Sequence, residues 1–109
     1  MEDRTIVGLV EEIVILSTNN KILARIDTGA TVSSIDAGLL EGIECEEIGH
    51  KIVRSSHGTT KRRLVAIEIE LGGKKVRGRF SVYDRSHMTY QILIGQDVLK
   101  QNFLIDPLK

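Results

Sequence analysis

Apolar and polar positions alternate over two long segments in the second half of the chain. Within residues 61–71, the odd positions from 65 onward are Val, Ile, Ile and Leu, whereas the even positions between them are Ala, Glu and Glu. Residues 76–82 alternate as well, and Ser81 falls on the outward face of that segment. Gly72-Gly73 separates the two segments and is a strong hairpin signal. The period of two predicts a pair of half-buried antiparallel strands.

The remaining apolar runs are short and are separated by turn-forming residues. We predict a strand system over 5–16 that bends at Gly8, a turn at 18–21, and a helical turn at 36–40. A loop is expected over 55–60, and a short helix over 96–102. Further strands are expected over residues 22–26, 32–35, 48–54, 92–95 and 103–106. Seven or eight short strands and one short C-terminal helix predict an all-β fold closed into a barrel.

Composition limits the kinds of protein that this chain can be. Its 109 residues are 41% apolar and 28% charged, which is typical of a folded protein, and we expect one domain over residues 1–109. The 15 basic and 15 acidic residues give no net charge, so the total favours neither nucleic acid nor a membrane as partner. We see no leader-like segment or long apolar run, and Cys45 is the single cysteine. These features predict a cytoplasmic protein without an internal disulfide.

The segment Asp27-Thr28-Gly29-Ala30 directly follows an apolar strand. A carboxylate at the end of a buried strand is costly unless it is hydrogen-bonded or used. Thr28 offers a hydroxyl, and Gly29 lets another chain approach the backbone closely. Two interpretations stay open on these residues alone: an ordinary turn capped by the aspartate side chain, or a reactive carboxylate.

A second segment favours the reactive carboxylate. Ile92, Leu93, Ile94 and Gly95 form an apolar run that ends in glycine and precedes the expected helix. This order of Asp-Thr-Gly and apolar-apolar-Gly resembles the retropepsin-like aspartic proteases. The resemblance implies that residues 92–95 pack beside the Asp27 loop and hold its carboxylate in place.

The likeness is more specific over much of the chain. Residues 51–58 resemble the flap of the RimK-associated retropepsin-like family, and residues 7–9, 84–88 and 102–107 are also similar to that family. By this resemblance the flap comprises Arg54, Ser55, Ser56, His57 and Gly58, with His57 exposed at the tip and without a catalytic role. The hairpin over residues 54–60 would close over a substrate, although a plain mobile hairpin is the alternative.

The resemblance also implies how such a site would work. One chain carries one Asp-Thr-Gly, so a dyad requires Asp27 from each of two chains in a homodimer. The dyad would activate water against a peptide bond. Thr28 would brace the loop, and Gly29 and Ala30 would contact substrate backbone. The terminal strands would pair with the partner's copies, because their edges would otherwise stay unpaired.

The family is often labelled an ATP-dependent zinc protease and is associated with a ligase that adds glutamates to a ribosomal protein. This implies glutamate-extended tails as substrates and a RimK-type glutamate ligase as a partner. The sequence supports neither ATP nor zinc, since it lacks a phosphate-binding loop and a His-Glu-x-x-His motif. Candidate zinc ligands are Cys45, His50, His57 and His87. We expect no metal and no cofactor.

Two positions depart from related sequences. Thr31 and Gln96 stand where viral enzymes form an ion pair, so we expect a neutral contact between them. Basic stretches at residues 61–63 and 74–79 are interpreted as solvated strand faces or, alternatively, as attractants for acidic peptides. Three functions therefore stay open: an Asp27-dependent protease, a non-catalytic dimerisation or peptide-binding module, and a metal-dependent hydrolase.

Overall fold

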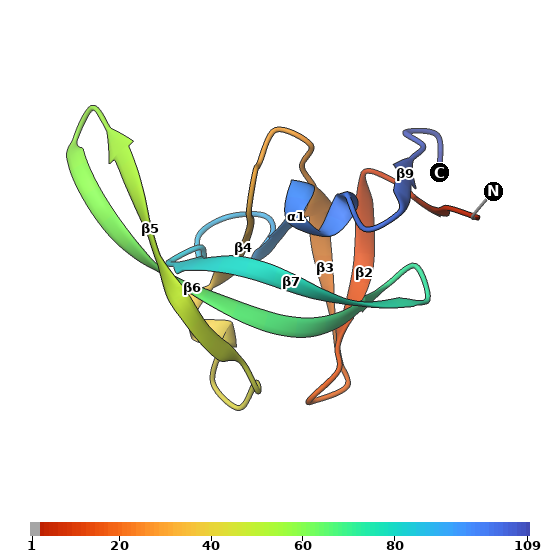
Figure 1. Ribbon diagram of the computed structural model, residues 1–109, viewed down its shortest axis with the longest axis horizontal. Coiled ribbons are helices and arrows are strands. Elements are labelled where there is room, and N and C mark those ends of the chain that lie inside the picture. The colour runs from red at the N-terminus through yellow and green to blue at the C-terminus, as the bar shows by residue number, and fades with distance from the viewer. Residues whose placement is uncertain (1–2) are drawn as a thin grey trace.

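A computed structural model describes residues 3–109 as nine strands, one short 3-10 helix and one short α-helix (Figure 1). The elements are, in chain order, β1 (Thr5–Val7), β2 (Val10–Ile15), β3 (Asn20–Ile26), β4 (Ser33–Asp36), η1 (Ala37–Leu39), β5 (Glu46–Ser55), β6 (Gly58–Leu71), β7 (Lys74–Tyr83), β8 (Ile92–Ile94), α1 (Gln96–Leu99) and β9 (Phe103–Ile105). The prediction of an all-β fold with one short helix near the C-terminus is confirmed. No helix within residues 3–109 has the length and apolar character needed to span a membrane.

The main sheet closes on itself. Its strands run in the order β2-β3-β8-β4-β7-β6-β5, and β2 also pairs with β6 through Val14–Glu70 and Ile15–Ile69. This second pairing closes six strands of this sheet, all except β5, into a ring and so removes most of the sheet's free edges. The sheet is therefore compatible with the predicted closed barrel, and β5 is attached outside the ring.

Inward-facing aliphatic side chains fill this ring. The buried face predicted for residues 65–71 is confirmed, since Val65, Ile67, Ile69 and Leu71 are all buried, but Ala66 on the opposite face is buried as well. Glu68, between them, is exposed. Burial of such a β-branched core stabilises the fold by roughly 1.5–3 kcal/mol per large side chain. The largest fully buried side chains are those of Phe80, Ile13, Ile15, Ile35, Ile67, Ile69, Leu71, Ile92, Ile94, Val7, Val65 and Val98.

Both predicted turns between antiparallel strands are present. Asn19 adopts φ 59°, so β2 and β3 reverse through a left-handed asparagine as the sequence predicts. Gly72 and Gly73 have φ 59° and 83°, values that side chains rarely tolerate, and they join β6 to β7.

The β5–β6 hairpin projects from the ring as a long arm, at the upper left of Figure 1. The loop predicted over 55–60 is wrong in extent. Strand β5 continues to Ser55 and β6 begins at Gly58, so only Ser56 and His57 form the turn. Thr, Lys and Arg at positions 59–63 carry no apolar pattern, but their backbones pair with β5 throughout. Backbone pairing thus extends the two strands over residues whose side-chain pattern does not predict a strand.

The helix and one strand position also differ from the prediction. Helix α1 ends at Leu99 rather than at residue 102, and Asn102 closes the following turn with φ 76°. Ser81, expected to face solvent, is buried, and its hydroxyl lies 3.3 Å from that of Ser34 on β4. Strand β4 pairs with β7 in parallel and covers Ser81, a contact that periodicity along a single strand does not report.

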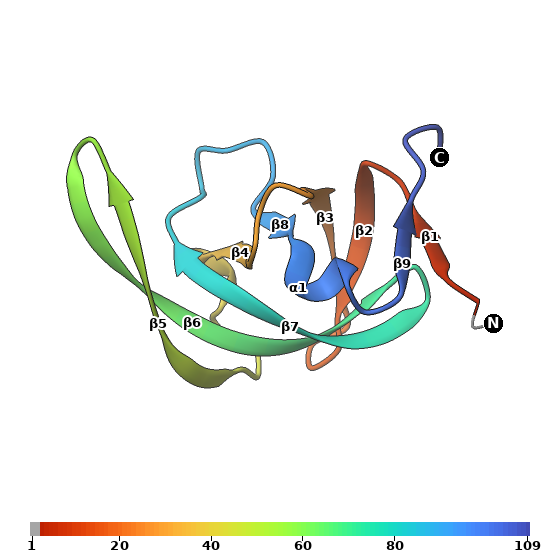
Figure 2. The same cartoon turned by 45° about the horizontal axis from the view of Figure 1, so that its top comes forward.

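The two ends of the described chain pair with each other. Strands β1 and β9 are parallel, with Thr5 opposite Phe103 and Val7 opposite Ile105, and Figure 2 shows them side by side. The backbone N–H of Asp106 donates to the Val7 carbonyl at 2.8 Å. The two strands form a separate two-stranded sheet. Each has one partner and one free edge.

Candidate functional site

Asp27 stands where strand β3 ends beside β8. The two strands are parallel, with Ile26 opposite Ile94, and the Asp27 N–H donates to the Ile94 carbonyl at 2.9 Å. Ile26 and Ile94 are both buried, so the residue that precedes the carboxylate is fixed in the core. Strand β8 thus packs beside the Asp27 loop, as the order of the two motifs predicts.

The loop after Asp27 folds back on its carboxylate. Gly29 N–H donates to Asp27 Oδ1 at 3.0 Å, and Ala30 N–H donates to the Asp27 carbonyl at 3.2 Å. This is the turn capped by an aspartate side chain, and it leaves Oδ2 available. Asp27 is half-buried and not buried as expected, while Thr28 and Gly29 are exposed. One chain therefore presents the carboxylate at an open surface.

Gly95 allows the Asp27 loop to lie directly on the segment after β8. A Cβ atom at Gly95 would lie 2.6 Å from the Ala30 carbonyl oxygen and 3.0 Å from the Val32 carbonyl carbon. These are backbone atoms, which cannot turn aside as the end of a flexible side chain can, so any larger residue would force the backbone to shift. The next residue continues the contact, because the Gln96 N–H donates to the Ala30 carbonyl at 2.8 Å.

The side chain of Gln96 makes a different contact from the one expected. Its Nε2 donates to the Thr28 carbonyl at 2.8 Å, whereas Thr31 is exposed. The predicted neutral contact between Thr31 and Gln96 is therefore wrong in its partner, because Gln96 bonds to Thr28 within the chain. Gln96 thereby holds the backbone of the Asp-Thr-Gly turn from the helix side.

Asp97 is an organising residue that sequence reasoning missed. Its Oδ1 accepts from the Ser33 N–H at 2.8 Å and from the Ser33 hydroxyl at 2.7 Å, and its Oδ2 accepts from the Arg79 N–H at 2.7 Å. Ser33 Oγ in turn accepts from the buried Gly95 N–H at 2.9 Å. These bonds connect α1, β4 and β7 around the base of the Asp27 loop. The one signal in the sequence that could have pointed to Asp97 is its place directly after Gly95 and Gln96, next to a recognised motif.

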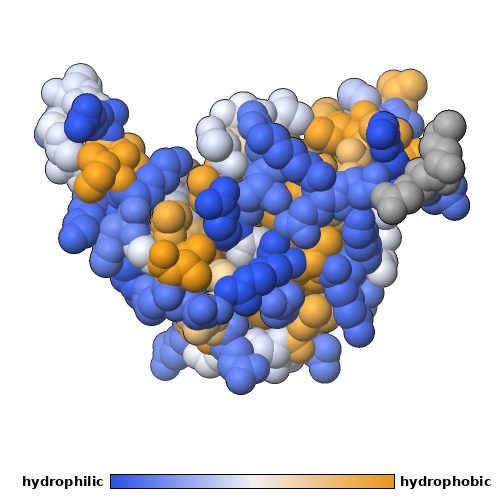
Figure 3. Space-filling view, in the orientation of Figure 1, coloured by the Kyte–Doolittle hydropathy of each residue, from blue (hydrophilic) through white to orange (hydrophobic). Residues whose placement is uncertain are grey.

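The flap residues form the far end of the arm. His57 is exposed at the tip, and its N–H donates to Ser55 Oγ at 3.2 Å. Gly58 adopts φ 117°, and Arg54 and Ser56 are exposed. Figure 3 shows that the arm stands clear of the body and leaves a hollow between them. The structure therefore brings the Asp27 loop and residues 92–95 together and places the flap away from both.

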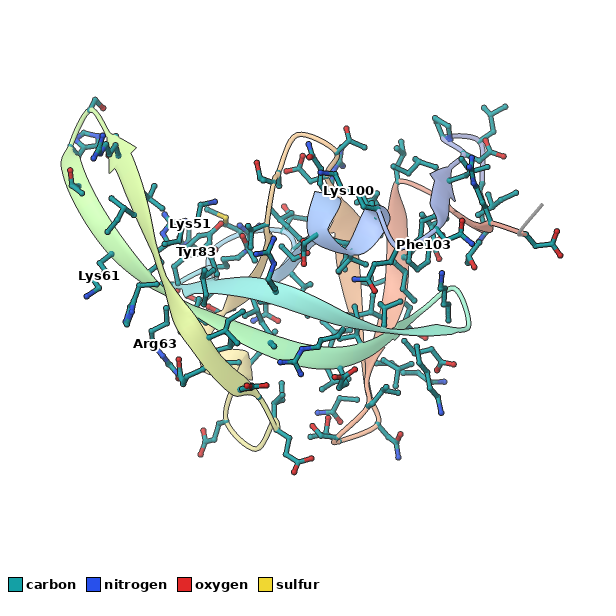
Figure 4. All side chains as sticks on the ribbon, viewed as in Figure 1. Lys51, Lys61, Arg63, Tyr83, Lys100 and Phe103 are labelled. Atoms are coloured by element: carbon teal, nitrogen blue, oxygen red, sulfur yellow. The ribbon has the colours of Figure 1, made fainter. Side chains whose placement is uncertain are left out.

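The two faces of the arm differ in charge. On the outer face Arg63 pairs with Glu47, which holds the pKa of Glu47 below its usual value through a side-chain hydrogen bond. The inner face carries Lys51 and Arg62, which are opposite each other in the β5–β6 register and are both partly buried. In Figure 4 Lys51 and Tyr83 lie between arm and body, whereas Arg63 points outward. Among the described residues neither Lys51 nor Arg62 makes an ion pair.

An arginine cluster supports the base of the arm. The Arg62 guanidinium lies 3.8 Å from the centre of the Tyr83 ring, and that of Arg85 lies 5.3 Å from the same ring. Arg85 is buried, and its Nε and one terminal nitrogen donate to the Tyr90 carbonyl at 3.1 and 2.9 Å. The backbone N–H of Arg85 donates to Oδ1 of the buried Asp36 at 2.7 Å. Arg62 Nε is buried without a partner among residues 3–109.

The candidate zinc ligands are scattered. Cys45, His50, His57 and His87 are all exposed. Within residues 3–109, no group of three His, Cys, Asp or Glu side chains is close enough to hold a metal ion. The described residues thus provide no donor set that fits a zinc ion.

Comparison with known proteins connects this geometry to a family. The sequence profile of the RimB-like family, described as retropepsin-like aspartic endopeptidase RimB, matches residues 40–109. The matched residues include the arm and β8 and begin after the Asp27 loop. Two curated relatives are probable alpha-L-glutamate ligases of Shewanella pealeana and Shewanella halifaxensis, 28% and 29% identical over 79% of the chain. The chain spans about a quarter (24%) of their length.

Solved structures share the fold. A Legionella pneumophila protein of unknown function superposes with a TM-score of 0.70 at 24% identity, covering 96% of this chain and 94% of that one. The protease of simian foamy virus superposes with a TM-score of 0.65 at 23% identity, covering 87% of this chain and 99% of the viral protein. At these identities the likeness establishes the retropepsin-like fold alone.

Proposed function

Because the chain belongs to the RimB-like family of retropepsin-like aspartic endopeptidases, we propose that it hydrolyses peptide bonds with two Asp27 carboxylates, one from each of two copies. The observation that carries this proposal is the Asp27 turn. Its backbone is bonded to β8 through Ile94, and its Gly29 N–H orients one carboxylate oxygen. A fixed, half-exposed carboxylate on a rigid turn is the geometry that a shared dyad needs.

The chemistry follows from two like charges held together. Carboxylates about 3 Å apart cannot both ionise, so the dyad shares one proton. The ionised carboxylate removes a proton from water, and the resulting hydroxide attacks the amide carbonyl carbon. The protonated carboxyl donates to the developing oxyanion, and a proton then passes to the leaving nitrogen. Asp36 and Asp97 are committed to hydrogen bonds inside the chain, so neither replaces the second Asp27.

The second copy is placed by a two-fold axis next to the exposed Thr28 and Gly29. An isologous interface brings each residue opposite its own copy, so Asp27 meets Asp27. The free edges of β1 and β9 supply further backbone donors and acceptors for the partner. In this dimer each arm covers the substrate, and Gly29 and Ala30 contact its extended backbone.

The inner face of the arm indicates which peptides would bind. Lys51 and Arg62 bring two positive charges toward the hollow with no acidic partner in the described chain, so an acidic side chain of the substrate would complement them. The curated relatives are probable glutamate ligases, proteins whose name implies glutamate-bearing products. We therefore extend the proposal to glutamate-extended or ribosomal-protein tails as substrates, and to a RimK-type glutamate ligase as a partner.

A non-catalytic dimerisation or peptide-binding module is the alternative. One observation favours it: Asp27 Oδ1 already accepts the Gly29 N–H, so the carboxylate has a structural use without any reaction. Both functions share the fold and the dimer. They differ in whether peptide bonds break.

Cleavage of a diverse peptide library, including glutamate-extended tails, separates the two functions. New termini are read by mass spectrometry for the parent and for Asp27→Asn, a substitution that preserves size and the Gly29 hydrogen bond. The protease proposal expects cleavage by the parent and none by the variant, with both proteins folded and dimeric. A dimeric parent that leaves every peptide intact would support the binding module.

A further inference from the structure

A second positively charged site lies on the flank of the molecule, away from Asp27 and the arm. An open pocket of about 600 Å³ is bounded by the β6–β7 hairpin, by α1 and the turn after it, and by the segment before β1. Its cationic lining residues are Arg4, Lys74, Lys75 and Lys100, and no acidic side chain among residues 3–109 lines it. In Figure 4, Lys100 lies beside α1 and Phe103 lies further toward β9, both away from the arm. This concentration of charge is notable because the whole chain has a formal charge of zero.

The pocket has an organised floor. Val76, Leu99 and Phe103 are buried beneath it and give it an apolar base. Lys74 is held at one side, since its Nζ donates to the Gln101 carbonyl and lies 5.2 Å from the centre of the Phe103 ring. A cation fixed in this way needs little ordering when an anion arrives.

Three cations around the floor are available for a ligand. Arg4, Lys75 and Lys100 are exposed, and none of them is in an ion pair among residues 3–109. Glu70 stands opposite Lys75 in the β6–β7 register but does not line the pocket. The basic residues of the neighbouring strand behave differently, because Arg77 is bonded to Glu46 and Glu68, which raise its pKa.

We propose that this pocket binds an acidic segment of a polypeptide. Carboxylates would meet the ring of cations, and the methylene groups of glutamate would lie on the apolar floor. A long phosphate polymer is a poorer match, because the chain has no net positive charge to attract it and Phe103 is buried rather than available for stacking. The inference goes beyond the proposed function and does not require that any peptide be cleaved.

Nuclear magnetic resonance on ¹⁵N-labelled Asp27→Asn protein tests this site without interference from cleavage. The protein is titrated with a glutamate homopeptide and, as control, with a glutamine homopeptide of the same length. The proposal expects the glutamate peptide to shift the amides of residues 74–76 and 99–103, with an effect that weakens as salt is added. The glutamine peptide should leave these amides unmoved.

Two charge-removal variants locate the binding. Replacing Arg4, Lys75 and Lys100 together by Gln should weaken binding at these amides roughly tenfold, since each exposed charge contributes modestly. Replacing Lys51, Lys61 and Arg62 of the arm by Gln should leave it unchanged. The proposal is overturned if the peptide shifts only arm and Asp27-loop amides, or if the pocket variant binds as tightly as the parent. It is also overturned if an oligonucleotide, but not the peptide, moves residues 74–76 and 99–103.

Discussion

Asp97 Oδ1 lies 2.7 Å from the hydroxyl of Ser33, and this contact ties helix α1 to the strand that follows the Asp27 loop. Ser33 also bonds to the segment after β8, because its Oγ accepts a hydrogen bond from the Gly95 N–H at 2.9 Å. Gly95 in turn lies directly against the backbone of Ala30, at the end of the Asp27 loop. The position of the proposed catalytic carboxylate therefore depends on a second aspartate, whose two carboxylate oxygens both accept hydrogen bonds within the chain.

Removing that second aspartate should destabilise the protein. Asp97→Ala leaves the N–H groups of Ser33 and Arg79 without their acceptor. Hydrogen bonds to a charged acceptor contribute about 1.5–3 kcal/mol each and are not additive, so we expect a loss of about 2–4 kcal/mol. Denaturant unfolding measures it. Glu41→Ala, at an exposed loop position, is the control and should change stability by less than about 0.5 kcal/mol.

A single added methyl group should disturb the same junction. In Gly95→Ala the new Cβ would meet the Ala30 oxygen at 2.6 Å, so the Asp27 loop must move away from β8. Overpacking of this kind costs about 1–3 kcal/mol. The melting temperature should fall, and peptide cleavage should fall further than stability explains, because the two carboxylates lose their alignment. An unchanged melting temperature would show that the backbone yields freely at this point.

The loop between β7 and β8 contains a carboxylate whose titration can be followed directly. The hydroxyl and N–H of Ser86 donate to Asp84 at 2.6 and 3.0 Å and hold the pKa of that carboxyl below its ordinary 3.8. Because its pKa is lower in the folded protein, the ionised Asp84 carboxyl stabilises the fold at pH values above its unfolded-state pKa. This stabilisation is lost as the pH falls through its folded-state pKa. Ser86→Ala should raise the pKa of Asp84 while the remaining N–H bond keeps it partly lowered. Carboxyl ¹³C titration measures this shift. Ser56→Ala should leave the Asp84 midpoint unchanged, and an equal midpoint in Ser86→Ala would contradict the assigned cause.

Charge on the inner face of the arm should set the preference for acidic peptides. Lys51→Gln removes a cation that faces the hollow, whereas Lys61→Gln removes one from the same hairpin on the outer side (Figure 4). The ratio of kcat/KM for a glutamate peptide to that for its glutamine analogue should fall about fivefold in Lys51→Gln. It should change little in Lys61→Gln. Equal effects of the two variants would mean that the arm attracts acidic peptides only through its overall charge.

Most of the barrel could be predicted because its strands carry their own pattern. Residues 65, 67, 69 and 71 are all large and apolar, and Gly72-Gly73 marks the reversal of the strand, so one buried face and one hairpin follow from local chemistry. The predicted arm is too short because residues 58–60 carry no apolar pattern, although their backbones pair with β5. Ser81 was assigned to solvent because the strand that covers it, β4, is distant in sequence.

The candidate site was accessible from sequence only in part. Asp27 and residues 92–95 form a recognisable pair of motifs, and the structure places them in contact through Ile94. Asp97 carries no motif, and Arg85 lies in a segment that only resemblance to the family singles out; the roles of both depend on partners far along the chain, such as Ser33 and Asp36. A long-range hydrogen bond leaves no periodic trace, so these residues become visible only once the sheet is assembled.

The proposed mechanism requires that two chains each supply one Asp27, and mixing the parent with an inactive variant tests this requirement. Parent and Asp27→Asn chains are unfolded together, refolded at constant total concentration in varying ratio, and assayed on a cleavable peptide. If the dyad needs Asp27 from both copies, activity falls with the square of the parent fraction, to about one quarter in an equal mixture. A linear fall, to about one half, would mean that one Asp27 suffices and would contradict the shared dyad.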